Sequence, residues 1–223
     1  MALILDLETA PIDDVTTYLE PVAAPSNYKD QEKIASYIKE KTQERAESAG
    51  LDPDLCRIVC LGYMREDLHR EPFVHICRDE HEERRALTEL WNHIVEGVDI
   101  ISFNGFRFDL PVIMRRSLYL NIPYRVLNMD RYRSNHIDLW QKLSFNGQIA
   151  AHSLSFYAQR FGFGGDLDIT GADVARLIRE GNYEAVAAHC RQDVWWTARL
   201  AQRLGYWDGV VDPQAKLAEA VGF

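Results

Sequence analysis

The chain has 223 residues, of which 47% are hydrophobic, and a formal net charge of −9, so it can bury one full core. An acidic total argues against a protein that coats nucleic acid, but not against a nucleic-acid enzyme, because carboxylates that hold divalent cations count as negative. It has no long apolar run, no features of a signal peptide and no C-x-x-C pair among four cysteines, which favours a reduced cytoplasmic protein outside the membrane.

The first third of the chain predicts three strands and a charged insertion. The opening run ALILDLET is short, apolar and bounded by Pro11, which is typical of a strand that enters a core. Five basic and five acidic residues lie between Lys29 and Glu47, around a thin apolar stripe, and indicate an exposed helix. That helix is either simply exposed to solvent or, alternatively, forms a lid over the first strand. RIVCLGYM and PFVHICR predict the next strands, so we expect a helical insertion at about 12–55.

The rest of the chain alternates helices with strands. EERRALTELWNHIVEG and FDLPVIMRRSLYLNI predict helices on either side of the buried strand DIISFNG. A fifth strand is expected at His136–Leu139, followed by short helices in SLSFYAQRFGF and GADVARLIREG. A long helix from about Tyr183 to Leu204, capped by Asn182 and ended by Gly205, precedes a C-terminal extension at about 206–223.

This order of elements predicts the fold class. Three consecutive strands followed by helix–strand alternation indicate an α/β fold with a mixed five-stranded sheet flanked by helices. The first three strands are expected to be antiparallel. The chain shows no internal repeat, low-complexity tract or linker, so residues 1–223 are expected to form a single domain.

Four acidic residues fall at positions that such a fold could bring together. Asp6 and Glu8 are two residues apart on the first strand, so both side chains point to the same face. Asp109 follows a strand and a glycine turn, and Asp193 lies on the last long helix. Taken alone, the first pair also suits a polar strand edge, and Asp109 also suits a helix N-cap. If the four converge, oxygen ligands of this number favour Mg²⁺ or Mn²⁺ over zinc.

Three stretches carry a resemblance to a known superfamily. LDLET, NGFRFDLPVI and HCRQDVWWT occur in this order, with HIDLW and SLSFYAQRFGF between the last two. Over about residues 3–204 the chain resembles the DEDD 3′–5′ exonucleases, which have a ribonuclease-H-like fold. It is most similar to stand-alone relatives of the proofreading domain of family B DNA polymerases. The resemblance implies metal-dependent hydrolysis at the 3′ end of single-stranded nucleic acid, with DNA favoured and nucleoside monophosphates as products.

The resemblance also implies a role for each acid in a two-metal mechanism with Mg²⁺ or Mn²⁺. Asp6, Glu8 and Asp193 would hold the ion that activates the attacking water. Asp6 would also bridge to the second ion, which Asp109 would reach mainly through water.

His189 departs from the pattern of the superfamily. In that group the attacking water is oriented by a tyrosine four residues before the last aspartate, or by a histidine five residues before it. Here the histidine stands four residues before Asp193, and Ala188 occupies the other position. Four residues return to nearly the same helix face, so we expect His189 to position the water or act as a general base. A degraded site and a structural histidine are the alternatives.

Substrate contacts are expected near the second motif. Asn104 and Phe108 are candidates for gripping the terminal nucleotide, although Phe108 also suits the core. The segment from Arg115 to Arg133 holds five arginines, three tyrosines and one aspartate, a local charge of +4. Guanidinium groups pair with phosphates and aromatic rings stack on bases, so we expect Arg115 and Arg116 to contact the single-stranded nucleic acid. Ordinary surface ion pairs are the alternative.

Three further interpretations remain open at this point. The chain could be a non-catalytic DEDD-fold module that binds nucleic acid or serves as a scaffold in a repair or replication complex. It could also be a metal phosphoesterase that digests short oligonucleotides but not long strands. A zinc site built from His189, Cys190, His75 and Cys77 would lack standard ligand spacing. All four acids are present, which favours the exonuclease.

Overall fold

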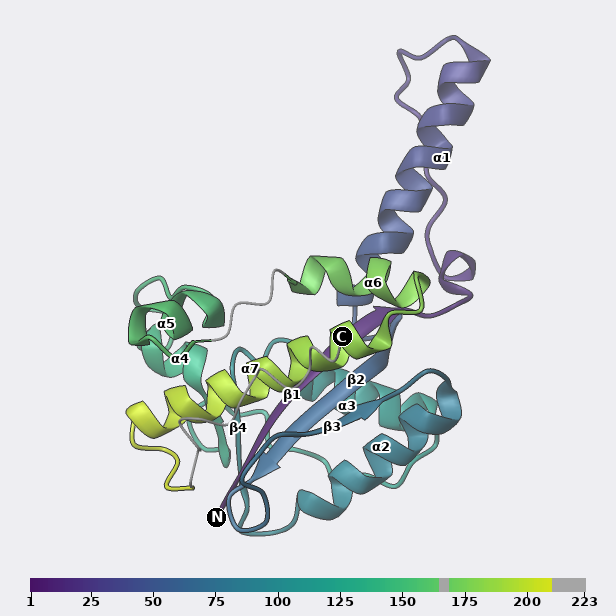
Figure 1. Ribbon diagram of the computed structural model, residues 1–223. Coiled ribbons are helices and arrows are strands. Elements are labelled where there is room, and N and C mark those ends of the chain that lie inside the picture. Colours follow the sequence, from purple (N-terminus) through teal and green to yellow (C-terminus); the bar gives the residue numbers. More distant parts are fainter. Residues whose placement is uncertain (165–168, 210–223) are drawn as a thin grey trace, which may run out of the picture.

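The centre of the protein is a five-stranded mixed sheet with the strand order β3-β2-β1-β4-β5 (Figure 1). A computed structural model describes residues 1–164 and 169–209, so most of the predicted C-terminal extension lies outside the described residues. β1, β2 and β3 are antiparallel, whereas β1, β4 and β5 are parallel, which confirms the predicted mixed sheet. The strands are β1 (Ala2–Pro11), β2 (Cys56–Arg65), β3 (Phe73–Ile76), β4 (Asp99–Ser102) and β5 (His136–Asp138).

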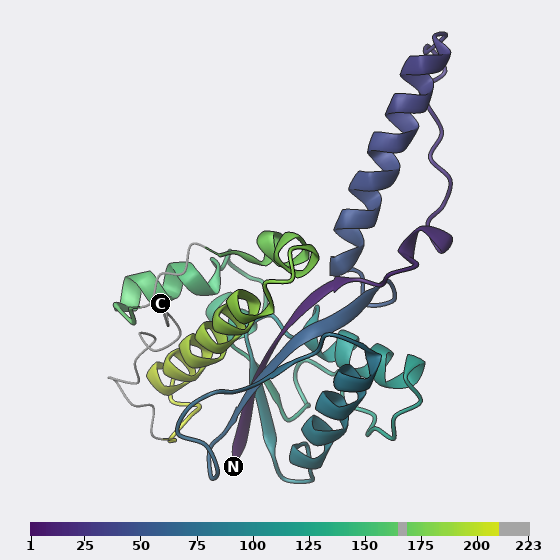
Figure 2. The same ribbon diagram turned by 45° about the vertical axis from the view of Figure 1, so that its right-hand side comes forward.

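Helices cover both faces of the sheet (Figures 1 and 2). α7 crosses one face, with α5 and α6 packed against it, and α2 and α3 cover the other face. Within the described ranges, no helix combines the length and the apolar character that crossing a membrane requires. The helices are α1 (Gln31–Ser48), α2 (Glu80–His93), α3 (Asp109–Tyr119), α4 (Leu139–Leu143), α5 (Leu154–Phe161), α6 (Gly171–Arg179) and α7 (Tyr183–Arg203), with 3₁₀ turns η1 (Val15–Thr17) and η2 (Ala49–Leu51).

The alternation of side chains along β1 divides the core in two. Leu5 and Leu7 are buried among residues of α2 and α3, whereas Ile4 packs beneath α5 and α7. Because side chains of a strand alternate between its faces, Asp6 and Glu8 lie on the α7 face. This is the arrangement that their spacing predicted.

The fifth strand is shorter than expected, because a helix starts inside the stretch HIDLW. The carboxylate of Asp138 accepts the backbone N–H of Trp140 at 3.0 Å and of Gln141 at 3.4 Å. This N-cap ends β5 at Asp138 and starts α4 at Leu139, a residue that the sequence placed in the strand. The short helix α4 was not predicted.

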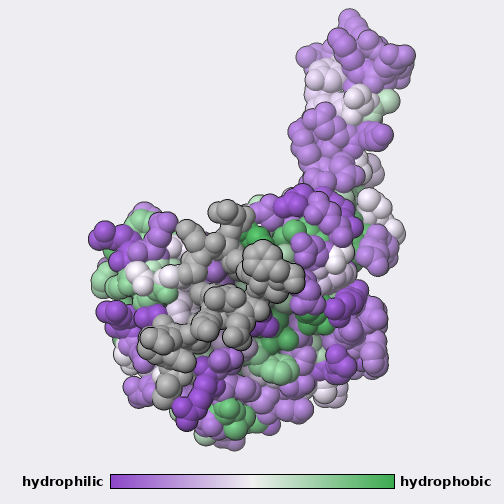
Figure 3. Space-filling model, viewed as in Figure 1, coloured by the Kyte–Doolittle hydropathy of each residue, from purple (hydrophilic) through white to green (hydrophobic). Residues whose placement is uncertain are grey.

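The charged segment forms an arm that projects from the body of the protein (Figures 1 and 2). Asp30 caps α1 by accepting the backbone N–H of Glu32 at 2.9 Å, and α1 contains no buried residue. Figure 3 shows that the surface of the arm is mostly hydrophilic. At its root, Ile12 N–H donates to the carbonyl of Leu55 at 3.0 Å, so the two ends of the insertion meet at the end of the β1–β2 ladder.

Candidate active site

Helix α7 lies close against the sheet where β2 carries Gly62. A Cβ added to Gly62 would come within 2.8 Å of Cys190 Sγ and of Val194 Cγ2, both on α7. In the β1–β2 ladder, Gly62 is the partner of Asp6. A side chain at position 62 would therefore push α7 away from the sheet, whereas glycine allows Asp193, next to Val194, to approach Asp6.

The N-terminus of α3 supplies the fourth carboxylate. Asp109 is buried and is the first residue of α3, so Phe108, not Asp109, is the N-cap. The turn before it is compact: a Cβ on Gly105 would collide with Ser102 and lie 3.4 Å from Asp109 Oδ2. Asn104 has a φ of 66°, a left-handed conformation that asparagine adopts more readily than most residues. This turn brings Asp109 back towards β1.

The four carboxyl groups lie close enough to interact. Burial raises the pKa of Asp6 well above its ordinary value, and repulsion from Asp193, Glu8 and Asp109 raises it further. Burial, followed by repulsion from Asp193, also raises the pKa of Glu8. Burial raises the pKa of Asp109 to about 7 and that of Asp193 to about 7. In the part of the chain that the structure describes, no lysine or arginine forms an ion pair with any of the four.

His189 points into this acidic cluster from α7. Its Nε2 atom lies 3.4 Å from Glu8 Oε1 and 3.9 Å from Asp193 Oδ2. Burial lowers the pKa of His189, so the imidazole is neutral at pH 7. The second ring nitrogen, Nδ1, is buried and has no hydrogen-bond partner among the described residues. His189 therefore faces the carboxylates, where its spacing from Asp193 predicted it.

The donor atoms of the cluster fit a hard divalent cation. Asp6 Oδ2 and Asp193 Oδ1 are buried without a hydrogen-bond partner in the described ranges. Ligand atoms of Glu8, His189 and Asp193 lie within 4.8 Å of one another. Buried carboxylates that repel one another are stabilised by a cation between them, and carboxylate oxygens are the ligands that Mg²⁺ and Mn²⁺ prefer. The residues present can therefore hold such an ion.

A comparison of the chain with protein families gives a match. Residues 51–221 match the family described as "Predicted 3'-5' exonuclease related to the exonuclease domain of PolB". The chain belongs to this family. The match contains Asp109, His189 and Asp193 and begins after Asp6 and Glu8. Membership of this PolB-like exonuclease family implies the use of a divalent metal, and a comparison with curated proteins gave no match.

A solved polymerase structure has a similar fold. The family B DNA polymerase of the hyperthermophilic archaeon Pyrobaculum calidifontis matches 91% of the chain at 18% identity, with a TM-score of 0.58. The chain spans 24% of that polymerase. A chain of an ExoI/SSB-Ct complex matches with 15% identity, a TM-score of 0.39 and coverage of 91% of this chain and 44% of its own. The polymerase match and the family confirm the ribonuclease-H-like DEDD fold.

Of the predicted substrate contacts, Arg116 lies inside the protein and is used by a buried ion pair. Its guanidinium is buried against Glu83, with Nε 2.7 Å from Oε1 and Nη2 2.8 Å from Oε2. Glu83 Oε1 also accepts the backbone N–H of Ile58 at 2.9 Å, so the pair joins α2, α3 and β2. Local charge could not reveal a partner 33 residues away. Arg115 is exposed and pairs with Asp54 at 3.1 Å, which is the alternative of a surface ion pair.

The other two predicted contacts lie at the turn before α3. Phe108 is partly buried and packs against the core between the sheet and α2 and α3, as its alternative interpretation held. Asn104 lines an open pocket, and its Oδ1 atom is buried without a partner in the described part of the chain.

Asp138 is a residue of the site that sequence reasoning missed. Its carboxylate accepts the backbone N–H of Asn104 at 2.8 Å and of Phe106 at 3.2 Å, which fixes the turn before α3. Burial raises the pKa of Asp138, and repulsion from Asp138 contributes to the raised pKa of Asp109. The signal was present in HIDLW, because an aspartate between an apolar strand and a helix is typical of an N-cap.

Proposed function

We propose that the protein is a divalent-metal-dependent 3′–5′ exonuclease that acts on single-stranded nucleic acid, with DNA the favoured substrate, and releases nucleoside monophosphates. The observation that carries this proposal is the cluster of four interacting carboxyl groups, with His189 facing them and no cationic ion-pair partner among the described residues. Burying charge without a partner destabilises a fold, so such a cluster indicates a function that needs it. Family membership and fold support the same reaction class.

Each acid has a proposed role. Asp6, Glu8 and Asp193 would hold a first ion, and Asp6 and Asp109 would hold a second. When bound, divalent ions supply Lewis acidity that lowers the pKa of a water molecule and offset negative charge on the phosphate. The side chain of Asp193 is 21% exposed, so the cluster is open to solvent at this residue.

His189 is the proposed water-positioning residue and general base. Its Nε2 atom faces Glu8 and Asp193, and burial keeps the ring neutral at pH 7. A neutral imidazole with its proton on Nδ1 offers Nε2 as an acceptor to the attacking water. A tyrosine at this position could orient a water through its hydroxyl group, whereas the imidazole can also take the proton.

The test is a gel assay with 5′-labelled single-stranded DNA and RNA, in Mn²⁺, Mg²⁺ or EDTA. We expect a metal-dependent ladder that shortens from the 3′ end, with mononucleotides as the product. Asp193→Ala should lower the rate by about 10³-fold or more, because a lost metal ligand removes several kcal/mol of transition-state stabilisation. His189→Ala should lower it by about 10²- to 10⁴-fold.

Three outcomes would overturn parts of the proposal. Full activity of Asp193→Ala with an intact fold would exclude the metal cluster as the catalytic site. Full activity of His189→Ala would remove the role of His189 alone. Strand binding without cleavage under every metal condition would favour the scaffold interpretation, and cleavage of dinucleotides but not of longer strands would favour the phosphoesterase.

A further inference from the structure

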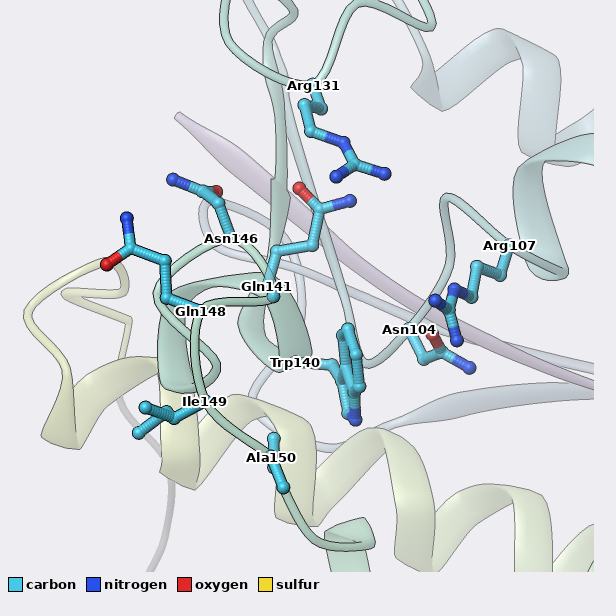
Figure 4. Close-up of a pocket in the computed structure, with 11 residues that line it drawn as sticks. Asn104, Arg107, Arg131, Trp140, Gln141, Asn146, Gln148, Ile149 and Ala150 are labelled. Atoms are coloured by element: carbon cyan, nitrogen blue, oxygen red, sulfur yellow. The ribbon is translucent and has the colours of Figure 1, made fainter.

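A polar pocket with a volume of about 390 Å³ adjoins the candidate active site and has no role in the proposed hydrolysis (Figure 4). It lies between the turn before α3, the turn that carries Arg131 and the turn after α4. The size falls in the range of small-ligand sites, about 300–1,000 Å³. The residues that line it include Asn104, Arg107, Arg131, Trp140, Gln141 and Asn146.

The pocket and the acidic cluster share one rigid turn. Asn104 lines the pocket, whereas the next residue, Gly105, packs so closely that an added Cβ would lie 3.4 Å from Asp109 Oδ2. Asp138 holds the backbone of Asn104 and, through its capping bonds, also positions α4, which carries Trp140. The turn before α3 therefore connects the wall of the pocket, at Asn104, with the acidic cluster, at Asp109.

Arg107 is arranged as an anion-binding group. Its guanidinium carbon lies 4.9 Å from the centre of the Trp140 ring, and Figure 4 shows the two side chains on the same side of the pocket. Stacking on an indole holds a guanidinium in place without using its N–H donors. Among the residues that the structure describes, Arg107 has no acidic ion-pair partner, so these donors remain available to a ligand.

Arg131 also lines the pocket, and Figure 4 shows its side chain pointing towards Gln141. The acid next to it, Asp130, is used by the turn itself, since its Oδ1 accepts the backbone N–H of Tyr132 at 2.8 Å and of Arg133 at 3.1 Å. In the described ranges Arg131 likewise forms no ion pair with an acid. Two free guanidinium groups therefore face one cavity of a chain whose net charge is −9.

An exposed aromatic residue, Phe145, precedes the pocket residue Asn146 in the turn after α4. Phe145 and Asn146 both adopt left-handed conformations, with φ of 50° and 59°, and the turn is fixed by a hydrogen bond from Gly147 N–H to Ser144 Oγ at 3.1 Å. Two such residues in succession cost free energy that the surrounding structure must offset, and strain of this kind gathers at binding sites. In this turn the side chain of Phe145 is 62% exposed.

We propose that this pocket binds a nucleotide of the single strand on the 5′ side of the scissile phosphodiester. Arg107 and Arg131 bind backbone phosphates, and the exposed ring of Phe145 stacks on a base. The proposal rests on the proposed function, because the terminal nucleotide must occupy the acidic cluster for the pocket to receive its neighbour. These contacts read phosphate and ring faces, so binding is largely independent of base sequence.

Binding is tested separately from cleavage. Fluorescence anisotropy of labelled ten-nucleotide oligothymidylate and oligouridylate, with the full chain in EDTA, gives the affinity of whichever strand binds more tightly. We expect Arg107→Gln and Arg131→Gln each to weaken binding about tenfold. Each should also reduce the slope of log affinity against log salt by about 0.7. Arg85→Gln, at an exposed arginine of α2 on the other face of the sheet, is the matched control and should bind as the wild type does.

Cleavage supplies the second readout. The p-nitrophenyl ester of thymidine 5′-monophosphate carries an aryl group in place of the 5′-side nucleoside, so it lacks the further backbone phosphates that the two arginines are proposed to bind. Its kcat/KM with Mn²⁺ should therefore change by less than about twofold in the arginine variants, while KM for the ten-nucleotide strand rises. A loss of ester hydrolysis in these variants would overturn the proposal, because the arginines would then act on the reacting nucleotide.

The remaining outcomes separate this inference from the proposed function. Wild-type strand affinity in the Arg107→Gln/Arg131→Gln double variant would overturn the pocket assignment and leave the exonuclease intact. Weaker binding of free thymidine 5′-monophosphate with unchanged strand binding would also overturn it, in favour of a mononucleotide site. If no substrate is hydrolysed by the wild type, the proposed function fails, whereas the anisotropy results still decide whether the pocket holds a strand.

Discussion

The two faces of the central sheet bury carboxylates in opposite ways. On the face covered by α2 and α3, Glu83 receives both a bidentate guanidinium from Arg116 and a backbone N–H. On the α7 face, Asp6 and Asp193 each bury an oxygen that has no hydrogen-bond partner in the described ranges. The same sheet thus supports one carboxylate whose charge is matched and a cluster whose charge is not.

The difference separates structural from functional buried charge. A paired carboxylate fixes how elements pack, and its replacement affects stability. An unpaired cluster of buried acids destabilises the fold unless a cation binds to it. Replacing one of these acids should therefore lower activity and leave the fold equally stable or more stable. The predictions below test whether the two faces divide in this way.

The largest effect on stability is expected on the paired face. Arg116→Met leaves Glu83 buried without its counter-charge and should lower the free energy of unfolding by about 3–5 kcal/mol. Urea denaturation followed by circular dichroism measures it. The double variant Glu83→Gln/Arg116→Met removes both charges and should recover much of the loss. If Arg116→Met lowers the free energy of unfolding by less than about 1 kcal/mol, the Arg116–Glu83 pair stabilises the fold no more than a surface ion pair does.

Metal binding should give the next largest effect, on the unpaired face. Mn²⁺ at about a hundredfold above its Kd should stabilise the wild type by about 2.7 kcal/mol. Asp193→Asn should gain much less, because it lacks one ligand. In EDTA at pH 8, Asp193→Asn should instead be more stable than the wild type. Burial raises the pKa of Asp193 to about 7, so at pH 8 its carboxylate is charged and destabilises the metal-free fold. Thermal unfolding in both buffers measures this. If Mn²⁺ leaves the unfolding temperature of the wild type unchanged, the proposed metal site is wrong.

A smaller effect concerns His136, a buried base that is uncharged and is hydrogen-bonded through only one of its ring nitrogens. Its Nε2 atom is hydrogen-bonded with Ser102 Oγ at 2.7 Å, and burial lowers its pKa to about 3. The unfolded chain binds a proton near pH 6.5 that the folded chain does not, so stability falls as pH decreases below 6.5 towards 3. Between pH 7 and pH 5 this contribution is about 2 kcal/mol.

The variant His136→Gln isolates that contribution. Urea denaturation at both pH values should give a loss about 2 kcal/mol smaller in the variant than in the wild type. Other groups titrate equally in both proteins, so they cancel in the comparison. An identical loss would mean that His136 titrates alike in the folded and unfolded chains.

Much of the fold followed from sequence periodicity. The alternation in ALILDLET placed Asp6 and Glu8 on one face, and the four-residue spacing placed His189 beside Asp193. Both are local geometry, fixed by the repeat of a strand or a helix. The order of strands and the resemblance of three motifs extended this local information to the ribonuclease-H-like fold.

The errors came from contacts between distant residues. Arg116 looked like part of a basic segment because its partner Glu83 lies on another helix. Asp138 looked like the end of a strand, although its carboxylate holds a turn 34 residues earlier in the chain. The sequence pattern likewise gives no sign of the close approach of α7 to Gly62. Such pairings depend on tertiary packing, which short-range patterns do not encode.

The charged arm has a consequence for how this chain tolerates change. Pro11 and Cys56 form the last pair of the β1–β2 ladder, so the whole arm is topologically the loop of a β-hairpin. The entropy of closing a loop grows only with the logarithm of its length, so a tenfold longer loop costs about 2 kcal/mol. The hairpin register is set by the strands on either side. Insertions and deletions can therefore accumulate in this loop over evolution while Asp6 and Glu8 keep their places on β1.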